Sequence, residues 1–279
     1  MDIINQVEQL LEKGKVDIFI GYKELDGHVI PHGFTKENLE EIKELKTGEN
    51  RYSLEKMAAH LTKKNKDLKI GIIARDCNKR ALNGLYVWNQ LNPENIETID
   101  INCCPSKIKP HADCSYLEPK KSGEFKKEHG IEFSADPEEL MEKYDNNERL
   151  ARWMYEFSKC IKCYGCRNIC PVCFCTECSL EDPNLVETGN LPPDIPIFHL
   201  VRASHMAGRC IDCGLCEDAC PAEIPLRLLY REMNQIVSDV FDYQPGQNME
   251  KSPFTVIGDK VTLAPKPMET LKEEKNNEL

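Results

Sequence analysis

The sequence lacks several features that would assign it to a common class at once. None of its apolar runs approaches the ~20 residues that a membrane-spanning helix needs. Acidic residues outnumber basic ones by 47 to 36, and a net charge of −11 does not favour non-specific binding to nucleic acid. The N-terminus has no basic stretch followed by an apolar one, so we expect a cytoplasmic protein without a signal peptide.

Signatures of common enzyme sites are missing as well. No Gly-x-Gly-x-x-Gly follows the apolar segment 70–74, so the usual dinucleotide fingerprint is absent. There is no Walker A lysine, and no Ser-His-Asp arrangement can be argued. Apolar residues nevertheless make up 41% of the chain, which is enough to bury a core and excludes full disorder.

Cysteine is the residue in excess, with 15 copies. Eleven of them lie in the 61 residues from Cys160 to Cys220, four come earlier, and none follows. A secreted chain could use such cysteines as a disulfide framework. In a reducing cytoplasm, thiols at fixed short spacing favour metal binding instead.

One cysteine pattern occurs twice. Residues 160–171 and 210–221 both read C-x2-C-x2-C-x3-C-P, the signature of two-cluster ferredoxins. Zinc sites use separate C-x2-C pairs, so zinc and disulfides explain this repeat less well. In this signature, the fourth cysteine of each motif binds the cluster of the other motif. We therefore predict two 4Fe-4S clusters, the first held by Cys160, Cys163, Cys166 and Cys220 and the second by Cys210, Cys213, Cys216 and Cys170.

Three further cysteines follow the first motif, within the 39 residues from Pro171 to Arg209. Two interpretations stay open. These residues could be buried thiols that shield the first cluster and donate weak hydrogen bonds to it, or they could bind additional metal. They are Cys173, Cys175 and Cys178.

The first 118 residues are typical of an α/β domain. Apolar runs predict three strands, at 16–20, 70–74 and 96–101. Amphipathic spacing predicts helices near 6–11, 39–45, 54–61 and 78–91. The strand, helix and strand between residues 70 and 101 form a βαβ unit.

Four cysteines belong to this domain: Cys77, Cys103, Cys104 and Cys114. Cys77 follows the strand 70–74, and Cys103 follows the strand 96–101. The carboxyl ends of parallel strands form the ligand-binding edge of an open α/β sheet. The four thiols could therefore ligate a third 4Fe-4S cluster, or they could be unrelated buried thiols, and their spacing does not decide between these alternatives.

The rest of the chain divides by composition. Residues 119–145 form a charged linker and a helix, and residues 146–245 hold both cysteine motifs. Helices are predicted in the latter part at 147–159, 198–206 and 225–240. Residues 246–279 form a C-terminal extension that we expect to be partly disordered, since its end is rich in Lys, Glu and Asn. The expected fold is an α/β N-terminal domain followed by an α-helical dicluster ferredoxin-type domain.

Part of the α/β domain carries a more specific pattern. It reads Lys69-Ile-Gly-Ile-Ile-Ala-Arg75-Asp-Cys77-Asn-Lys-Arg80, then Asn89-Gln90, then Ile99-Asp-Ile-Asn-Cys103-Cys104. This resembles the beta subunits of deazaflavin-reducing hydrogenases and formate dehydrogenases, which carry Lys-Gly-Cys-Asp-x-Arg at the matching place. The resemblance implies an iron–sulfur cluster at Cys77, Cys103 or Cys104, and Cys114. It also implies bound FAD near Arg75 and Arg80.

A second pattern spans roughly residues 155–241. Cys166-x3-Cys170-Pro-x-Cys173-Phe-Cys175 is followed by a long insertion and by the second ferredoxin motif. This arrangement is similar to the dicluster subunits of anaerobic sulfite reductases and related hydrogenases. Those subunits relay electrons between a flavin-bearing partner and a catalytic partner.

We therefore expect an iron–sulfur electron-transfer subunit of an anaerobic oxidoreductase complex, of the formate dehydrogenase, hydrogenase or heterodisulfide reductase type. It would relay single electrons between partner subunits, at least one of them flavin- or metal-bearing, and would not be catalytic alone. The alternative is a flavin-containing catalytic beta subunit that acts on a small redox carrier. A free ferredoxin would be far shorter, and an iron–sulfur regulator would need a DNA-binding motif that the sequence lacks.

Overall fold

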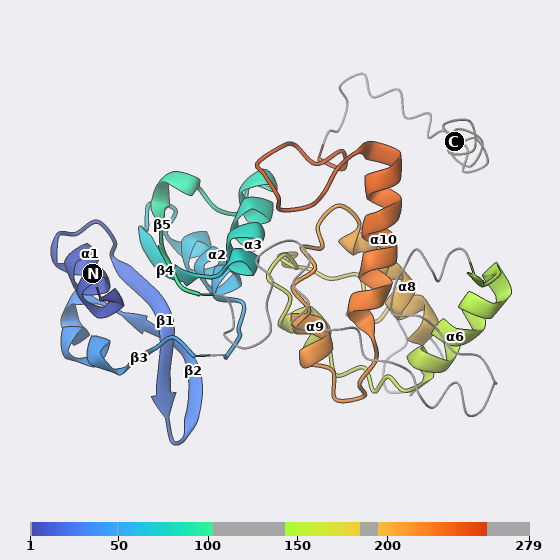
Figure 1. Ribbon diagram of the computed structural model, residues 1–279, viewed down its shortest axis with the longest axis horizontal. Helices are drawn as coiled ribbons and strands as arrows, with labels where there is room; N and C mark the ends of the chain where they lie inside the picture. Colours follow the sequence, from blue (N-terminus) through green and yellow to red (C-terminus); the bar gives the residue numbers. More distant parts are fainter. Residues whose placement is uncertain (1, 49, 103–142, 185–194, 256–279) are drawn as a thin grey trace.

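The computed structural model describes residues 2–48, 50–102, 143–184 and 195–255, and the structural statements below concern these residues. They form an α/β half and a helical half that carries both cysteine motifs (Figure 1). The predicted order, an α/β region followed by a helical region, is confirmed. The linker predicted from residue 119 and the tail of the C-terminal extension lie outside the described residues.

The α/β half contains one five-stranded sheet. Its strands are β1 (Ile18–Leu25), β2 (His28–Phe34), β3 (Leu45–Lys46), β4 (Ile70–Ala74) and β5 (Ile96–Asp100). The order across the sheet is β2-β1-β4-β5, and β3 pairs with β1. β1, β4 and β5 run parallel. Every residue of β4 is buried, which explains its uninterrupted apolar sequence.

Three α-helices pack on this sheet: α1 (Ile3–Glu12), α2 (Leu54–Lys64) and α3 (Asp76–Val87). Two shorter 3-10 segments, η1 (Lys36–Glu44) and η2 (Pro93–Asn95), connect the strands. The predicted βαβ unit is confirmed, because β4 and β5 are parallel neighbours joined through α3. Gly14 follows the end of α1 with a φ of 64°, a left-handed conformation that is typical of a glycine just after a helix.

The sheet also contains a hairpin that the sequence analysis missed. β1 continues past residue 20 and pairs antiparallel with β2, so that Leu25 lies opposite His28. The two turn residues, Asp26 and Gly27, have φ angles of 51° and 79°, as a type I′ turn requires. The Asp-Gly dipeptide was the available signal. The helix predicted at 39–45 was wrong in type, because this stretch falls largely in the 3-10 segment η1.

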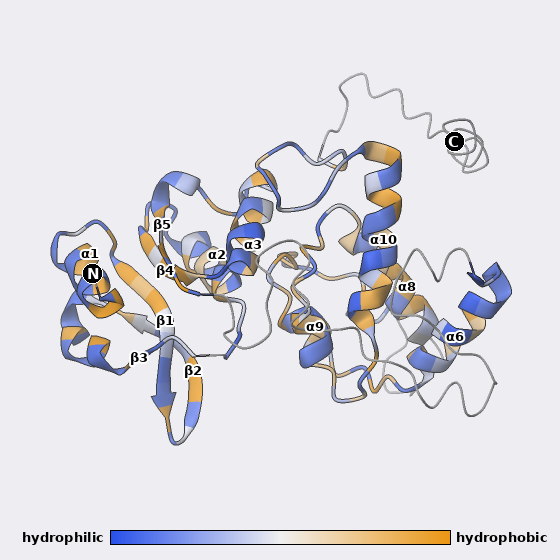
Figure 2. Ribbon diagram, in the orientation of Figure 1, coloured by the Kyte–Doolittle hydropathy of each residue, from blue (hydrophilic) through white to orange (hydrophobic). Residues whose placement is uncertain are grey.

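The helical half consists of α6 (Asn146–Ser158), α7 (Gly165–Asn168), α8 (Ile195–Met206), α9 (Leu215–Asp218) and α10 (Leu226–Phe241). The three longer helices match those predicted at 147–159, 198–206 and 225–240. α8 packs against α6 and α10, and the short helices α7 and α9 pack on each other. The apolar residues of α10 gather on one side (Figure 2), where Leu229 and Val237 are buried. No helix among the described residues is long and apolar enough to cross a membrane.

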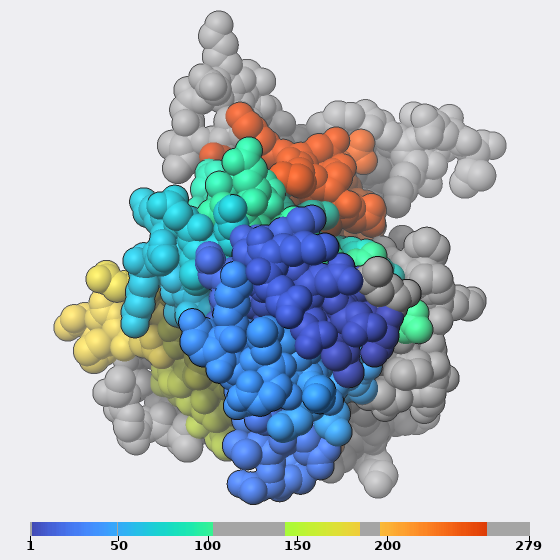
Figure 3. Space-filling model, turned by 90° about the vertical axis from the view of Figure 1, so that its left-hand side faces the viewer, coloured from blue at the N-terminus to red at the C-terminus, as the bar shows by residue number. Residues whose placement is uncertain are grey.

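The helices α2 and α3 lie on the side of the sheet that faces the cysteine motifs (Figure 1). From α2, the Lys56 ammonium donates to the carbonyls of Arg167 (3.2 Å) and Asn168 (2.9 Å) at the end of α7. From α3, the Asn83 amide donates to the carbonyl of Gly246 (3.0 Å). Figure 3, viewed from the opposite side of the sheet, shows the α/β half, in blue to green, in front of the helical half. The two halves are therefore joined by polar contacts from two helices.

Candidate metal centres

The first cavity is lined by the four cysteines that the crossed pattern assigns to the first cluster. Two of its thiols come from the loop that leads into α7, a third lies in α7 itself, and the fourth comes from the end of the second motif. They are Cys160, Cys163, Cys166 and Cys220.

The second cavity is built in the same way. Two of its thiols come from the loop before α9, a third lies in α9 itself, and the fourth comes from the end of the first motif. They are Cys210, Cys213, Cys216 and Cys170. Each cavity thus brings together one predicted set of four cysteines, and each set draws on both motifs.

The two loops share one backbone conformation. Lys162 and Tyr164 have φ angles of 51° and 58°, and the matching residues Asp212 and Gly214 have φ angles of 53° and 76°. A left-handed conformation is uncommon for residues other than glycine and costs on the order of 1 kcal/mol or more. Because the same costly conformation occurs at matched positions of both loops, we infer that cluster binding requires this loop geometry.

This loop conformation directs backbone N–H groups at the cysteine sulfur atoms. The amide two residues after Cys160 donates to its Sγ at 3.3 Å, and the amide two residues after Cys163 donates to its Sγ at 3.5 Å. The matching amides after Cys210 and Cys213 donate to those sulfur atoms in the same way. Backbone N–H groups aimed at sulfur stabilise the thiolate form and tune a bound cluster.

Even with these N–H donors, the buried thiols would not ionise by themselves at neutral pH. Burial raises the pKa of Cys166 to about 11 and the pKa of Cys210 to about 12. It raises the pKa of Cys213 and of Cys216 well above the usual thiol value. A multiply charged cluster reverses this preference, because it binds thiolate directly and supplies positive charge. Four thiols around one cavity, with N–H donors to the first two cysteines of each motif, therefore fit a cubane iron–sulfur cluster.

A cubane makes a different demand from a single metal ion. No three His, Cys, Asp or Glu side chains in the described ranges converge on a point that could hold one ion. A 4Fe-4S cluster instead takes four cysteines spread around a cavity, each bound to a different iron. Both four-cysteine cavities have this arrangement.

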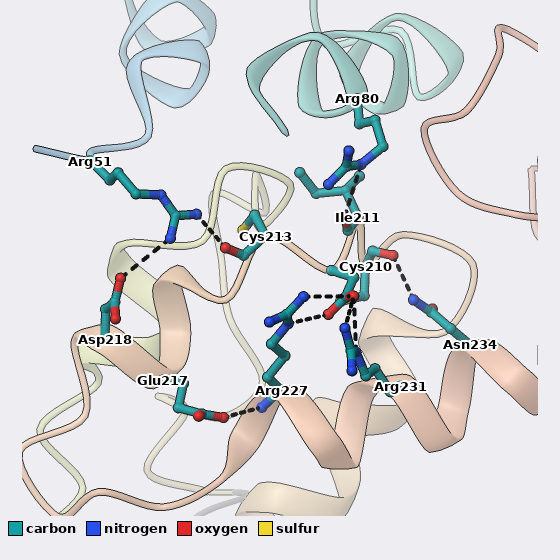
Figure 4. A network of polar contacts seen from close by, with 11 residues as sticks. Arg51, Arg80, Cys210, Ile211, Cys213, Glu217, Asp218, Arg227, Arg231 and Asn234 are labelled. Carbon is teal, nitrogen blue, oxygen red and sulfur yellow. Dashed lines mark hydrogen bonds and ion pairs between the residues drawn. The ribbon is translucent and has the colours of Figure 1, made fainter. Parts of the chain in front are cut away.

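A polar network anchors the second loop to α10 (Figure 4). The Asp212 carboxylate accepts from the guanidinium groups of Arg227 (2.6 Å) and Arg231 (2.9 Å). The Asn234 amide donates to the carbonyl of Cys210 (2.8 Å). Since Arg227 is almost fully buried, this ion pair contributes to a fixed loop geometry rather than to a mobile surface contact.

The α/β half holds the same loop from the other side (Figure 4). The Arg51 guanidinium donates to the carbonyl of Cys213 and lies 3.5 Å from the carboxylate of Asp218. The Arg80 guanidinium donates to the carbonyl of Ile211 (3.2 Å). The second cysteine motif is therefore clamped between α10 and the α/β half.

Cys77 lies in the first turn of α3 and is half-buried. Burial raises the pKa of its thiol, and the nearby charge of Arg51 opposes this effect. The other three cysteines assigned to a third cluster, Cys103, Cys104 and Cys114, lie outside the described residues. The third cluster therefore stays a prediction.

The two arginines assigned to a flavin have different partners. Arg75 is buried inside the α/β half, where its guanidinium donates to the carbonyl of Gly48 and faces the ring of Tyr22 at 6.0 Å. Arg80 instead lines an open polar pocket beside the second motif, together with Arg231 of α10. Of the two arginines, only Arg80 lines this pocket.

The three extra thiols differ in exposure. Cys173 and Cys178 are half-buried and Cys175 is exposed, so the interpretation of three buried thiols is wrong for Cys175. None of the three is among the described residues that line the two four-cysteine cavities. The sulfur of Cys173 accepts a hydrogen bond from Arg202 (3.8 Å).

Two buried polar residues of α8 were not predicted. His199 lines the first cavity and stacks on Phe157, with 4.7 Å between the ring centroids. Desolvation, together with the charge of Arg202, lowers the pKa of His199 to about 4, so its imidazole is neutral. Arg202 is 2% exposed and donates to the carbonyl of Cys166 (2.9 Å). A histidine and an arginine inside the apolar run 195–203 were the available signal.

Comparison with protein families supports the cluster chemistry. A family model described as a 4Fe-4S binding domain matches residues 204–225. That segment contains the whole second motif, from Cys210 to Cys220. The prediction of a 4Fe-4S cluster is therefore confirmed for at least one site.

Two curated relatives extend this finding. The F420-dependent formate dehydrogenase subunit beta of Methanocaldococcus jannaschii is 46% identical over 105 residues, which are 38% of this chain and 28% of the relative. The F420-dependent formate dehydrogenase 1 subunit beta of Methanococcus maripaludis is 46% identical over 114 residues, which are 41% of this chain and 28% of the relative. The resemblance to formate dehydrogenase beta subunits is confirmed, and it covers little more than a quarter of the length of these relatives.

Proposed function

We propose that this chain is an iron–sulfur electron-transfer subunit of a formate dehydrogenase-type complex. It would relay single electrons between partner subunits and carry out no chemistry on its own. The observation that carries the proposal is the pair of four-cysteine cavities, each of which draws thiols from both motifs. The similarity to formate dehydrogenase beta subunits supports this type of complex.

The ligand assignment follows the crossed pattern. The first cluster would be held by Cys160, Cys163, Cys166 and Cys220, and the second by Cys210, Cys213, Cys216 and Cys170. Both would belong to a dicluster ferredoxin-type domain at 146–245, which follows an α/β domain at 1–118. A third cluster would use Cys77 with Cys103 or Cys104 and Cys114. Bound clusters supply one-electron storage, and the protein supplies thiolates, N–H donors and apolar walls.

The contacts of the two halves favour an order for the relay. The α/β half would exchange electrons with the second cluster, because α3 packs against the second motif and Arg51 contacts the carbonyl of Cys213. The charge of Arg51 also acts on Cys77, so both places share one neighbour. The first cluster would exchange electrons with a partner subunit, since Cys163 is exposed.

The alternative is a catalytic beta subunit that binds a flavin. The open polar pocket beside the second motif favours it, because Arg80 and Arg231 would suit a phosphate-bearing ligand there. In that case a flavin next to the second cluster would pass electrons to it one at a time.

The test is to count iron, acid-labile sulfide, zinc and flavin in the full chain after anaerobic purification. We expect about eight iron and eight sulfide for two clusters, or about twelve of each with the third. Cys77→Ala should lower a count of twelve to eight and leave a count of eight unchanged. Cys175→Ala is the matched control and should bind as much iron as the wild type.

Other outcomes would change the conclusion. A count of about four iron would restrict cluster binding to one motif and overturn the relay through two clusters. One flavin per chain would favour the catalytic alternative over the relay. Zinc in place of iron would refute both.

A further inference from the structure

Arg202, in the second half of α8, is a buried cation without a carboxylate partner in the part of the chain that the structure describes. Its two terminal nitrogens donate to the carbonyl of Cys166 (2.9 Å) and to the sulfur of Cys173 (3.8 Å). Arg227 is equally buried, but the Asp212 carboxylate lies 2.6 Å away and balances its charge. Because a buried charge is costly unless an opposite charge accompanies it, Arg202 needs a counter-charge from another source.

The position of Arg202 indicates that source. Cys166, whose carbonyl it contacts, lines the first cavity. Tyr230, whose ring its guanidinium faces at 5.9 Å, lines the second cavity. Burial dominates the pKa of Cys166 and of Cys170 and raises both, and the charge of Arg202 opposes this rise at both thiols. One thiol belongs to each predicted ligand set, so a single cation acts on both sites.

We propose that Arg202 is the shared counter-charge of the two clusters and keeps both of their reduction potentials higher than they would be without it. This inference rests on the proposed function, because it requires a cluster in each cavity. Four thiolates give a cubane a net negative charge, and reduction makes that charge more negative. A cation held in a low-dielectric interior therefore stabilises the reduced form of each cluster.

The other cations near the first motif are less suited to this role. The Lys56 ammonium is bound to the carbonyls of Arg167 and Asn168 at the end of α7. Arg167 directly follows Cys166 but pairs with the Glu181 carboxylate near the surface. Solvent and the paired carboxylate screen its charge. Arg167 therefore offers a matched control, in which the same charge is removed from an adjacent but screened position.

The experiment is a redox titration of the full chain under anaerobic conditions, followed by electron paramagnetic resonance of the reduced clusters. At the wild-type midpoint, Arg202→Gln and Arg202→Met should lower the ratio of reduced to oxidised cluster at least tenfold at both sites. For a one-electron couple this corresponds to a fall of about 59 mV. Arg202→Lys keeps the charge and Arg167→Gln leaves Arg202 in place, so both ratios should stay within about threefold of wild type.

Iron content on the same samples separates the two hypotheses. A wild-type chain with fewer than two clusters refutes the proposed function, whatever the midpoints are. Midpoints that stay within threefold in a fully loaded Arg202→Gln chain overturn the role of Arg202, and so does a shift at one cluster only. If neither neutral variant binds iron, the Arg202→Lys variant decides. Midpoint potentials equal to those of the wild type support the role of the Arg202 charge, and a tenfold lower ratio of reduced to oxidised cluster contradicts it.

Discussion

Ile161 and Ile211 occupy the same position in the two cysteine motifs, one residue after the first cysteine. Ile161 is 53% exposed, whereas Ile211 is only 4% exposed. The difference comes from α3 and from the segment after α10. Arg80 donates to the carbonyl of Ile211, and Gly84 and Gly246 both lie close enough for a Cβ to touch its side chain. Equal cysteine spacing thus makes equal loops, but the neighbouring domain decides which loop solvent can reach.

The matched charged residues of the two motifs repeat this contrast. Arg167 in the first motif pairs with Glu181 near the surface. The matching residue of the second motif, Glu217, is buried and accepts a hydrogen bond from the backbone amide of Arg227 (3.1 Å). The first motif therefore presents its polar side chains outward, and the second turns them toward α10. An outward and an inward cluster would suit a relay from the α/β half to a partner.

The first prediction concerns iron loss from the two sites. When the loaded chain is mixed with an excess of iron chelator, iron should leave in two phases of about equal amplitude. The outward first cluster should be about tenfold faster than the covered second one, a ratio that corresponds to ~1.4 kcal/mol of additional opening cost. Absorbance of the chelated iron gives both rates.

Variants of the fourth cysteines test the crossed ligands in the same assay. Cys220→Ala should remove the fast phase, because Cys220 lines the first cavity, and Cys170→Ala should remove the slow phase. If each motif instead kept its own fourth cysteine, the two variants would exchange their effects. A single phase in the wild type would contradict the difference in accessibility.

The second prediction compares Asp212 with Lys162, which have matching positions and nearly equal φ angles. Asp212→Asn leaves the buried Arg227 without its ion pair, and removing one partner of such a pair costs about 3–5 kcal/mol. Lys162→Asn leaves the buried pair of Arg227 and Asp212 intact, so it should change the free energy of unfolding by less than about 1 kcal/mol, as expected for a half-buried lysine. Asparagine tolerates the left-handed conformation in both places.

Urea unfolding of the loaded chains under anaerobic conditions measures this difference. The midpoint of Asp212→Asn should fall clearly below that of Lys162→Asn, at equal iron content before denaturant is added. Equal losses in the two variants would show that the network on α10 does not distinguish the second motif from the first.

Much of this contrast could not be predicted from the sequence. The grouping of cysteines depends on short, local spacing, so the pattern C-x2-C-x2-C-x3-C-P predicts the two sets that line the two cavities. The long helices and the βαβ unit follow from periodic apolar residues in the same way. The exposure of Ile161 and Ile211 depends on how α3 packs, and no local pattern contains that information.

The other features that the sequence did not predict also depend on tertiary packing or on weak local patterns. Arg202 lies in an apolar helix, and its place between two cavities depends on α10 and on both motifs. The strand β2 contains Pro31, His32 and Gly33 in succession, so its apolar alternation is weak, although the Asp26-Gly27 dipeptide indicates the turn before it. Neither the sequence nor the structure decides whether the third cluster exists, because the cysteine spacing matches no known motif and three of the four cysteines lie outside the described residues.

The smallest expected effect concerns the residues that precede each motif. The Arg209 guanidinium lies 4.0 Å from the ring centroid of Trp88, at the end of α3, whereas Lys159 lies over Tyr155 within its own helix at 4.6 Å. A cation–π contact of this kind contributes about 0.5–2 kcal/mol. Arg209→Ala should therefore loosen α3 from the second motif and speed the slow phase of iron loss severalfold, with the fast phase unchanged. Lys159→Ala is the matched variant and should leave the slow phase as it is. An equal effect of both variants on the slow phase would mean that α3 is not what covers the second cluster.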